Sequence, residues 1–377
     1  MFSGAAPGRR LRRSAGRGRP SDGGTGVGTL APMPVDKVLL AAPRGFCAGV
    51  EMAIKALAWM VRAFEPPVYC YHEIVHNRLV VDRFRDLGVV FVDDIDEVPE
   101  GRPIMLSAHG SAPEVVAAAK ARGSYVVNAV CPLVTKVHHE VKTRAGKGYR
   151  IVYVGHEGHE EAVGTMAVAP DAIDRVESVA EVDALPQATA DQPVALLAQT
   201  TLSHREWSAI AERAAERFPG LWRPGRSDLC FATTNRQSAL AEIAPRCDAV
   251  VVIGSANSSN TRALEQLARE SGGDRVYRVN GPDELPDDLS GVVGVTAGAS
   301  APEELIEAVI ARLAPSGGVD EVRITDEDEY FPPPRELRDL LTGVDVLATF
   351  GLGGSVPDRP GVNDRALAAS DVLTMLD

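Results

Sequence analysis

The chain has 377 residues and a formal net charge of −13 at pH 7. That charge argues against nonspecific binding to nucleic acids, although a local pocket can still attract an anion. No apolar run approaches the ~18 residues that a membrane-spanning helix requires, so we expect no contact with a membrane. The five cysteines are an odd number and no secretory apolar core is present, so we expect a reducing cytoplasm and no disulfide framework.

The first 34 residues differ in composition from the rest of the chain. They carry six arginines and a single acidic residue, Asp22, among many Gly and Pro. This composition is typical of disordered segments, so we expect a flexible extension there. A transit peptide and a start codon placed too early, with Met33 as the true start, stay open as alternatives.

From Val35 onward, continuous apolar segments alternate with amphipathic ones, which is typical of parallel α/β units. The pattern begins with a strand at 36–42 and a helix at 48–64. Further strands are predicted at 102–108, 124–130, 149–155, 193–199, 248–254 and 291–297, and further helices at 112–122, 133–144, 205–218, 261–270 and 301–313.

Three cysteines and six polar residues near the strand ends repeat with a similar spacing. Cys47 is followed by His76 and His109, Cys131 by His159 and Thr200, and Cys230 by Ser258 and Ser300. The first polar residue follows its cysteine after 29, 28 and 28 residues respectively. Because ligands bind beyond the carboxyl ends of parallel strands, this repetition predicts three similar α/β units that face a common centre.

Three thiolates that converge on one point can hold a metal and leave one coordination position open. Zinc and iron–sulfur clusters both accept cysteine sulfur, so the residues alone leave the two open. The other two cysteines, Cys70 and Cys247, are interpreted as buried apolar residues. The polar loops supply His, Ser and Asn beside Gly-rich backbone, which suits a phosphate, and no Walker A or dinucleotide motif accompanies them. The pattern therefore indicates a small phosphorylated substrate beside a metal centre.

The order of motifs carries a specific resemblance. Along the chain stand PRGFCAGVEMAI, HEIVHN, SAHG, CPLVTKVH, GHEGHEE, QTTLS, CFATTNRQ, NSSN and GVTAGAS. Over roughly residues 35–337 the chain thereby resembles the 4-hydroxy-3-methylbut-2-enyl diphosphate reductase family. The resemblance implies three α/β domains with mainly parallel sheets, arranged pseudo-threefold around a central [4Fe-4S] cluster. It also implies reductive removal of a hydroxyl from an allylic diphosphate, which gives isopentenyl and dimethylallyl diphosphates as the last step of the methylerythritol phosphate pathway.

The resemblance implies a role for each motif residue. Cys47, Cys131 and Cys230 correspond to the cluster ligands and Glu161 to the proton donor, while His159 and Thr200 position the reacting end. The diphosphate is expected to contact His76, His109, Ser258, Ser259, Asn260 and Ser300. No dedicated nicotinamide or flavin motif is present, so we expect a ferredoxin- or flavodoxin-like protein to supply the electrons.

We expect the chain to divide into five parts. Residues 1–34 form the extension, 49–131 the first α/β domain, 132–228 the second, 35–48 with 229–335 the third, and 336–377 a C-terminal tail. Within the tail, the Gly- and Pro-rich stretch 349–365 predicts a linker and 364–377 a short helix. The acidic stretch 325–330 is interpreted as a solvated turn, and the tail is assigned no chemistry.

The chain departs from the family pattern at three positions. Asn128 and Val130 precede Cys131 where the family usually has Asp and Thr, and Glu160 stands where many members have Pro. The changes at Asn128 and Val130 leave room for a noncatalytic paralogue that only binds a cluster or a diphosphate. A zinc-binding structural or hydrolytic protein is the other alternative.

Asn128 and Val130 remove a charge and a hydroxyl near a predicted cluster ligand, and both features tune reduction potentials. We therefore expect the double change Asn128→Asp, Val130→Thr to shift the reduction potential of the cluster measurably in a redox titration. An unchanged potential would refute the hypothesis.

Overall fold

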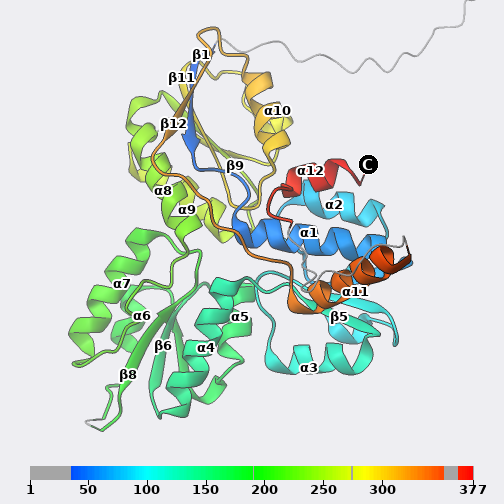
Figure 1. Cartoon of the computed structure of the whole chain (residues 1–377). Coiled ribbons are helices and arrows are strands. Elements are labelled where there is room, and N and C mark those ends of the chain that lie inside the picture. The colour runs from blue at the N-terminus through cyan, green and yellow to red at the C-terminus, as the bar shows by residue number, and fades with distance from the viewer. Residues whose placement is uncertain (1–34, 190, 273–274, 352–363, 377) are drawn as a thin grey trace, which may run out of the picture. The chain divides into compact units, whose positions relative to one another are not determined.

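The structure is a computed structural model that describes residues 35–189, 191–272, 275–351 and 364–376. The Arg-rich start and residues 352–363 of the predicted linker lie outside this part. Within it the strands form three sheets, each with parallel pairing throughout, and helices connect the strands (Figure 1). The predicted α/β class is confirmed.

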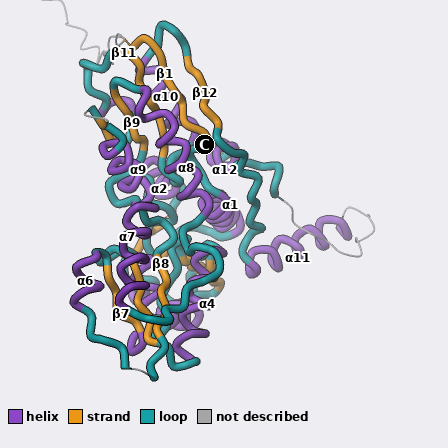
Figure 2. The backbone as a smooth tube through the Cα atoms, turned by 90° about the vertical axis from the view of Figure 1, so that its left-hand side faces the viewer, coloured by secondary structure: helices purple, strands orange, loops and turns teal. Residues whose placement is uncertain are grey.

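The largest sheet joins the beginning of the described chain to its later part. Its strands are β1 (Val35–Ala42), β9 (Ala249–Ile253), β10 (Val276–Val279), β11 (Gly291–Ala297) and β12 (Val319–Arg323), in the order β10-β9-β11-β1-β12. Figure 2 shows β1 running between β11 and β12, its partners in the sheet. Strand β9 is buried along its whole length, which explains its uninterrupted run of Val and Ile.

The other two sheets each come from one continuous stretch of chain. One has the order β3-β2-β4-β5, and the other has the order β7-β6-β8. Their strands are β2 (Val68–Tyr71), β3 (Val89–Val92), β4 (Pro103–Leu106), β5 (Tyr125–Asn128), β6 (Arg150–Val154), β7 (Ile173–Val176) and β8 (Val194–Ala198). The division into domains at the predicted boundaries, and their pseudo-threefold arrangement, stay predictions.

Twelve α-helices accompany the strands in the described residues. They are α1 (Ala48–Ala63), α2 (Arg78–Asp86), α3 (Pro113–Arg122), α4 (Pro132–Gly146), α5 (Glu160–Met166), α6 (Val179–Ala184), α7 (His204–Arg217), α8 (Phe231–Ile243), α9 (Ser259–Glu270), α10 (Glu303–Leu313), α11 (Arg335–Gly351) and α12 (Ala369–Thr374). Each predicted strand and helix has a counterpart here. None of the described helices combines the length and the apolar character that crossing a bilayer would require.

The C-terminal tail packs onto the sheet β3-β2-β4-β5 and its helix α1. Leu337 and Leu341 of α11 and Ala369 and Leu373 of α12 are buried in the same core as α1. The Lys55 ammonium of α1, almost wholly buried, donates to the carbonyl oxygen of Leu367 at 2.9 Å. The tail therefore contributes to the core, which its composition did not indicate.

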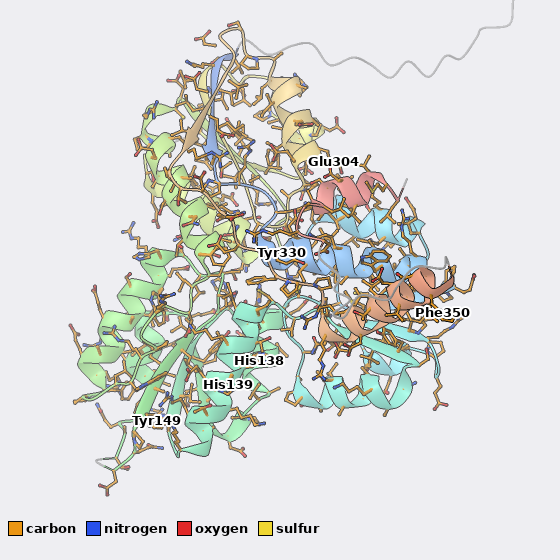
Figure 3. The ribbon with its side chains drawn as sticks, in the orientation of Figure 1. His138, His139, Tyr149, Glu304, Tyr330 and Phe350 are labelled. Carbon is orange, nitrogen blue, oxygen red and sulfur yellow. The ribbon has the colours of Figure 1, made fainter. Side chains whose placement is uncertain are left out.

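The start of the predicted linker is wrong by three residues, because 349–351 complete α11. The outer end of this helix stays in solvent: Phe350 is 76% exposed (Figure 3). The short helix predicted for the end of the chain is confirmed by α12.

A buried arginine fastens the loop before α1 to α8. The guanidinium of Arg236 is fully buried and donates to the carbonyl oxygens of Gly45 and Phe46 at 2.7 and 3.2 Å. It also pairs with the carboxylate of Glu327 at 2.9 and 3.1 Å. Within the acidic stretch predicted as a solvated turn, Asp326 and Asp328 are exposed, but Glu327 is paired. A fully buried charge needs such a partner, since loss of hydration would otherwise destabilise the fold.

Replacement of Glu327 by Gln would leave Arg236 without its counter-ion. We expect the free energy of unfolding to fall by ~3 kcal/mol, measured by urea denaturation of the whole chain. Glu329→Gln, at an exposed site two residues away, is the matched control and should change little. Equal stabilities of the two variants would contradict the importance of the pair.

Candidate active site

One cavity collects the predicted site residues. It has a volume of about 800 Å³, including space open to solvent, and polar loops from all three sheets line it. All the predicted residues face it: Cys47, His76, His109, Cys131, His159, Glu161, Thr200, Cys230, Ser258, Ser259, Asn260 and Ser300. The sequence repeat therefore corresponds to one shared space.

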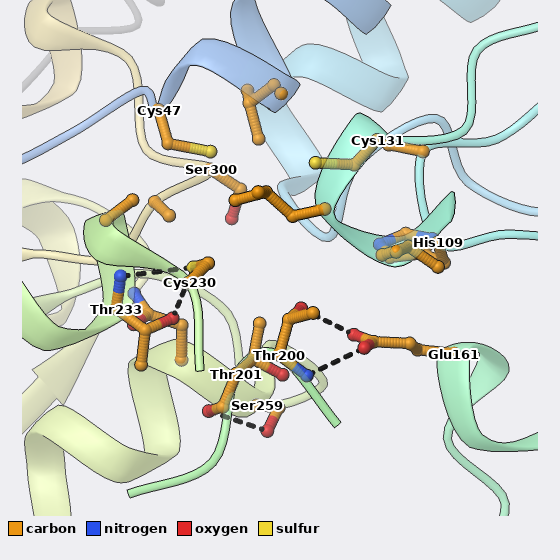
Figure 4. Close-up of a pocket in the computed structure, with 18 of the residues that line it drawn as sticks. Cys47, His109, Cys131, Glu161, Thr200, Thr201, Cys230, Thr233, Ser259 and Ser300 are labelled. Carbon is orange, nitrogen blue, oxygen red and sulfur yellow. Dashed lines mark hydrogen bonds between the residues drawn. The ribbon is translucent and has the colours of Figure 1, made fainter. Parts of the chain in front are cut away.

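The three cysteines occupy equivalent positions. Cys47, Cys131 and Cys230 are the N-cap residues of α1, α4 and α8. In Figure 4, the sulfur atoms of Cys47 and Cys131 point toward each other across the cavity. The unpaired backbone N–H groups at a helix N-terminus favour negative charge, so this position stabilises a thiolate.

Burial opposes ionisation of two of these sulfurs. It raises the pKa of Cys230 to about 11, and the neighbouring sulfur of Cys47 adds to the effect. Burial and Cys47 also raise the pKa of Cys131 far above the ordinary value of a thiol. Thr233 partly offsets this at Cys230, where its backbone N–H lies 3.2 Å from Sγ. Three thiolates at this site therefore require a bound cation.

Gly49 keeps the space between two of the sulfurs open. A Cβ atom at this position would lie 2.9 Å from Sγ of Cys131 and 3.9 Å from Sγ of Cys47. The surrounding wall includes Val50, Leu133 and Ala232, which offer no competing ligand atoms. An all-sulfur donor set in an apolar cradle fits an iron–sulfur cluster.

A buried carboxyl group stands in the same cavity. Glu161 is 2% exposed, and its two carboxyl oxygens accept hydrogen bonds from the backbone N–H and the hydroxyl of Thr200 at 2.7 and 2.9 Å (Figure 4). Burial raises the pKa of Glu161 to about 7, although both bonds from Thr200 oppose the shift. The group is therefore partly protonated near neutral pH, as a proton donor must be.

His159 is held as a neutral ring. It caps α5, and its Nδ1 accepts the backbone N–H of Glu161 at 3.2 Å. Burial, together with His109 and His76, lowers the pKa of His159 to about 3. Because Nδ1 is the acceptor, the proton of the neutral ring resides on Nε2.

Several polar atoms around the cavity are buried without a hydrogen-bond partner among the described residues. They include both ring nitrogens of His76 and both side-chain amide atoms of Asn260. Ser300 lies beside them, and its hydroxyl donates to the backbone carbonyl of His76 at 3.0 Å. Buried polar groups are normally paired, so these atoms indicate a polar ligand.

Glu160 was noted in the sequence only as a departure from the family, and its contact with the site was missed. Its Oε2 lies 2.7 Å from Nδ1 of His109, and ligand atoms of Glu160, His109 and His76 lie within 4.8 Å of one another. The two imidazole rings are stacked, with centroids 4.1 Å apart and planes at 16°. Their in-plane lone pairs are nearly parallel and cannot converge on one ion, so this group is poorly suited to hold a metal.

Sequence reasoning also missed Gly49 and Phe331, which line the cavity. Gly49 stands two residues after Cys47, so the motif itself carried a signal for it. Phe331 follows the acidic stretch and had no signal in the sequence. Of the histidines outside the predicted site, we expect solvated positions for His138, His139 and His204; His139 and His204 are exposed, while His138 is half-buried.

Comparison with known proteins places this fold and cavity in a family. The family described as LytB protein matches residues 38–314. The 4-hydroxy-3-methylbut-2-enyl diphosphate reductase of Rhodopirellula baltica is 48% identical over 314 residues, which cover 82% of this chain and 97% of that protein. The enzyme of the same name from Mycolicibacterium paratuberculosis is 48% identical over 307 residues, 80% of this chain and 92% of that protein.

Solved structures agree. The E-1-hydroxy-2-methyl-but-2-enyl-4-diphosphate reductase of Plasmodium falciparum matches with a TM-score of 0.79 at 30% identity, over 83% of this chain and all of that one. A structure of (E)-4-hydroxy-3-methyl-but-2-enyl diphosphate reductase, described as the terminal enzyme of the non-mevalonate pathway, matches with a TM-score of 0.55 at 29% identity, over 74% of this chain and 99% of that one.

The fold and the relatives together define an oxidoreductase. The chain belongs to the LytB protein family of 4-hydroxy-3-methylbut-2-enyl diphosphate reductases, which confirms the resemblance drawn from the motifs.

The space that Gly49 leaves beside the sulfurs of Cys47 and Cys131 can be tested by filling it with a methyl group. We expect Gly49→Ala to reduce the iron bound after anaerobic reconstitution by at least about half, because the new methyl group would contact Sγ of Cys131. Gly146→Ala, where nothing lies within 4 Å of the added Cβ, is the matched control. Full iron content and an unchanged absorption spectrum in Gly49→Ala would contradict the inference that Gly49 leaves space for the cluster.

Proposed function

We propose that this chain reduces (E)-4-hydroxy-3-methylbut-2-enyl diphosphate to isopentenyl and dimethylallyl diphosphates, the final step of the non-mevalonate route. The observation that carries the proposal is the buried pair of Glu161 and Thr200, which shares one cavity with three converging cysteines. A proton source and a redox-capable set of sulfur donors thus face the same cavity. The named activity of relatives at 48% identity supports the same reaction.

Cys47, Cys131 and Cys230 would hold one [4Fe-4S] cluster. When bound, the cluster supplies the electrons and one Lewis-acidic iron that no protein side chain ligates. Gly49 leaves room for it, and the N-termini of α1, α4 and α8 offset the negative charge of the sulfurs.

The remaining chemistry belongs to Glu161 and Thr200. Removal of the hydroxyl as water consumes two electrons and two protons: one proton leaves with the hydroxyl and one is added to the allylic carbon skeleton. Glu161 can deliver protons because burial holds its pKa at about 7. The hydroxyl of Thr200, 2.9 Å from the carboxyl oxygen, would orient the substrate hydroxyl and relay the proton. The neutral ring of His159 would help to position the reacting end.

The other polar residues that line the cavity would bind the diphosphate. His76, His109 and Ser300 lie on one side, and Ser258, Ser259 and Asn260 are supplied by the beginning of α9. The unpaired nitrogens of His76 and the amide of Asn260 suit an oxygen-rich ligand. A ferredoxin- or flavodoxin-like protein would supply the electrons.

The decisive experiment is anaerobic turnover of the allylic diphosphate with a chemical reductant, with products, iron and sulfide measured together. We expect a brown protein that forms both products. A colourless zinc protein would contradict the proposal. A fully loaded cluster without turnover would instead favour a noncatalytic paralogue.

Glu161→Gln tests the proton donor. We expect kcat/KM to fall about 100-fold or more, as loss of a general acid typically does. In the unsubstituted enzyme kcat/KM should decline as pH rises through about 7, because the acid form of Glu161 is lost there. That limb should be absent from the pH profile of Glu161→Gln.

The exposed neighbour Glu157 provides the control for this change. Glu157→Gln should retain both the rate and the limb. Retained activity in Glu161→Gln would contradict the assignment.

A further inference from the structure

Glu160 connects two sheets through its contact with His109, a residue that lines the cavity. It is the first residue of α5, after β6, while His109 follows β4. The Oε2 atom of Glu160 lies 2.7 Å from Nδ1 of His109, and its side chain is only 22% exposed. Glu160 thus contacts a histidine expected at the diphosphate, while its neighbour Glu161 contacts Thr200.

The carboxyl group of Glu160 stays ionised despite its burial. Burial alone would raise the pKa of Glu160, but the contact with His109 and the nearby His76 and His72 outweigh it and lower the pKa to about 2. For His109 the balance is reversed. Burial and His76 lower the pKa of His109, and Glu160 only partly opposes them. Without a ligand, an anionic carboxylate therefore faces a neutral imidazole.

This arrangement has a consequence for the second ring nitrogen. When the Nδ1 proton of His109 faces Glu160, Nε2 of the neutral ring carries a lone pair, which repels a phosphate oxygen. Nε2 can donate to that oxygen only after the ring takes up a second proton from solvent. An incoming diphosphate and the carboxylate of Glu160 both stabilise the imidazolium that results.

Titratable groups from several elements surround the ring of His109. They are His72, His76, His138, His159 and Glu160, with Glu73 acting at 3.5 Å through His76. Burial lowers the pKa of His138 and His159, so neither competes for the proton. Glu160 is the carboxylate in direct contact with His109.

We propose that Glu160 is a positioning residue that orients His109 and stabilises it as an imidazolium on the bound diphosphate, so that diphosphate binding takes up a proton. The inference rests on the proposed function, since it assumes that His109 contacts the diphosphate. Nε2–H then donates to a phosphate oxygen, while the carboxylate of Glu160, 2.7 Å from Nδ1, offsets the positive charge of the ring. In chains with proline at this position, that carboxylate is missing.

The test uses the reconstituted, cluster-loaded enzyme and inorganic diphosphate as the probe. Calorimetric titration in two buffers of different ionisation enthalpy measures both the Kd and the protons exchanged. We expect uptake of about one proton by the unsubstituted enzyme and little uptake by Glu160→Gln, together with a roughly tenfold weaker Kd. With the allylic diphosphate, the rise in KM of this variant should exceed its fall in kcat.

Two further variants make the result specific. Glu160→Asp keeps the charge and should restore part of the proton uptake. Asp93→Asn removes an exposed carboxylate that contacts His72 at 3.4 Å but is not in contact with His109, and it should behave as the unsubstituted enzyme.

The role of Glu160 and the proposed diphosphate site are contradicted by different results. Unchanged Kd and proton uptake in Glu160→Gln, with normal binding by the unsubstituted enzyme, would overturn the role of Glu160 alone. Failure of the loaded, unsubstituted enzyme to bind diphosphate would overturn the proposed diphosphate site and this inference with it.

Discussion

Three sulfur atoms that share one cavity at helix N-termini can be thiolates together only when a cation offsets the hydration that two of them have lost. Burial raises the pKa of Cys131 and Cys230, and the neighbouring sulfur of Cys47 adds to the shift at both. The N-termini of α1, α4 and α8 lessen this cost without removing it. The three sheets bring to one cavity three cysteines whose thiolates would repel one another, so this arrangement suits a bound metal centre. Arg236 supports the arrangement by holding the loop before Cys47 against the helix that begins after Cys230.

Three consecutive residues at the start of α5 make three different contacts. His159 caps the helix as a neutral ring, Glu160 contacts His109, and Glu161 forms two hydrogen bonds with Thr200. The two carboxyl groups are adjacent in sequence, yet their environments move their pKa values in opposite directions, to about 2 and about 7. Histidines surround the first and stabilise its anion, whereas burial dominates at the second. One short segment thus provides an ionised carboxylate beside His109 and an exchangeable proton beside Thr200.

The sequence predicted the parts of this protein in which local pattern and three-dimensional role coincide. Apolar strands such as β9 were recognisable. The cysteine and polar motifs mark strand-to-helix turns, except at Cys230, which follows the loop after helix α7. Some strands were not recognised: β12, for example, is an exposed edge strand with the polar sequence VDEVR. The packing of α11 and α12, the pairing of Glu327 with Arg236 and the contact of Glu160 with His109 join residues far apart in the chain. No local pattern encodes such contacts, because they depend on how the sheets are placed.

The central claim is that the three cysteines hold a cluster in which one iron is left for the substrate. Mössbauer spectroscopy of the protein reconstituted anaerobically with ⁵⁷Fe tests it most directly. We expect one iron site distinct from the others, whose spectrum changes when the allylic diphosphate is added. Equivalent iron sites that do not respond to the diphosphate, or a protein that binds no iron, would contradict it.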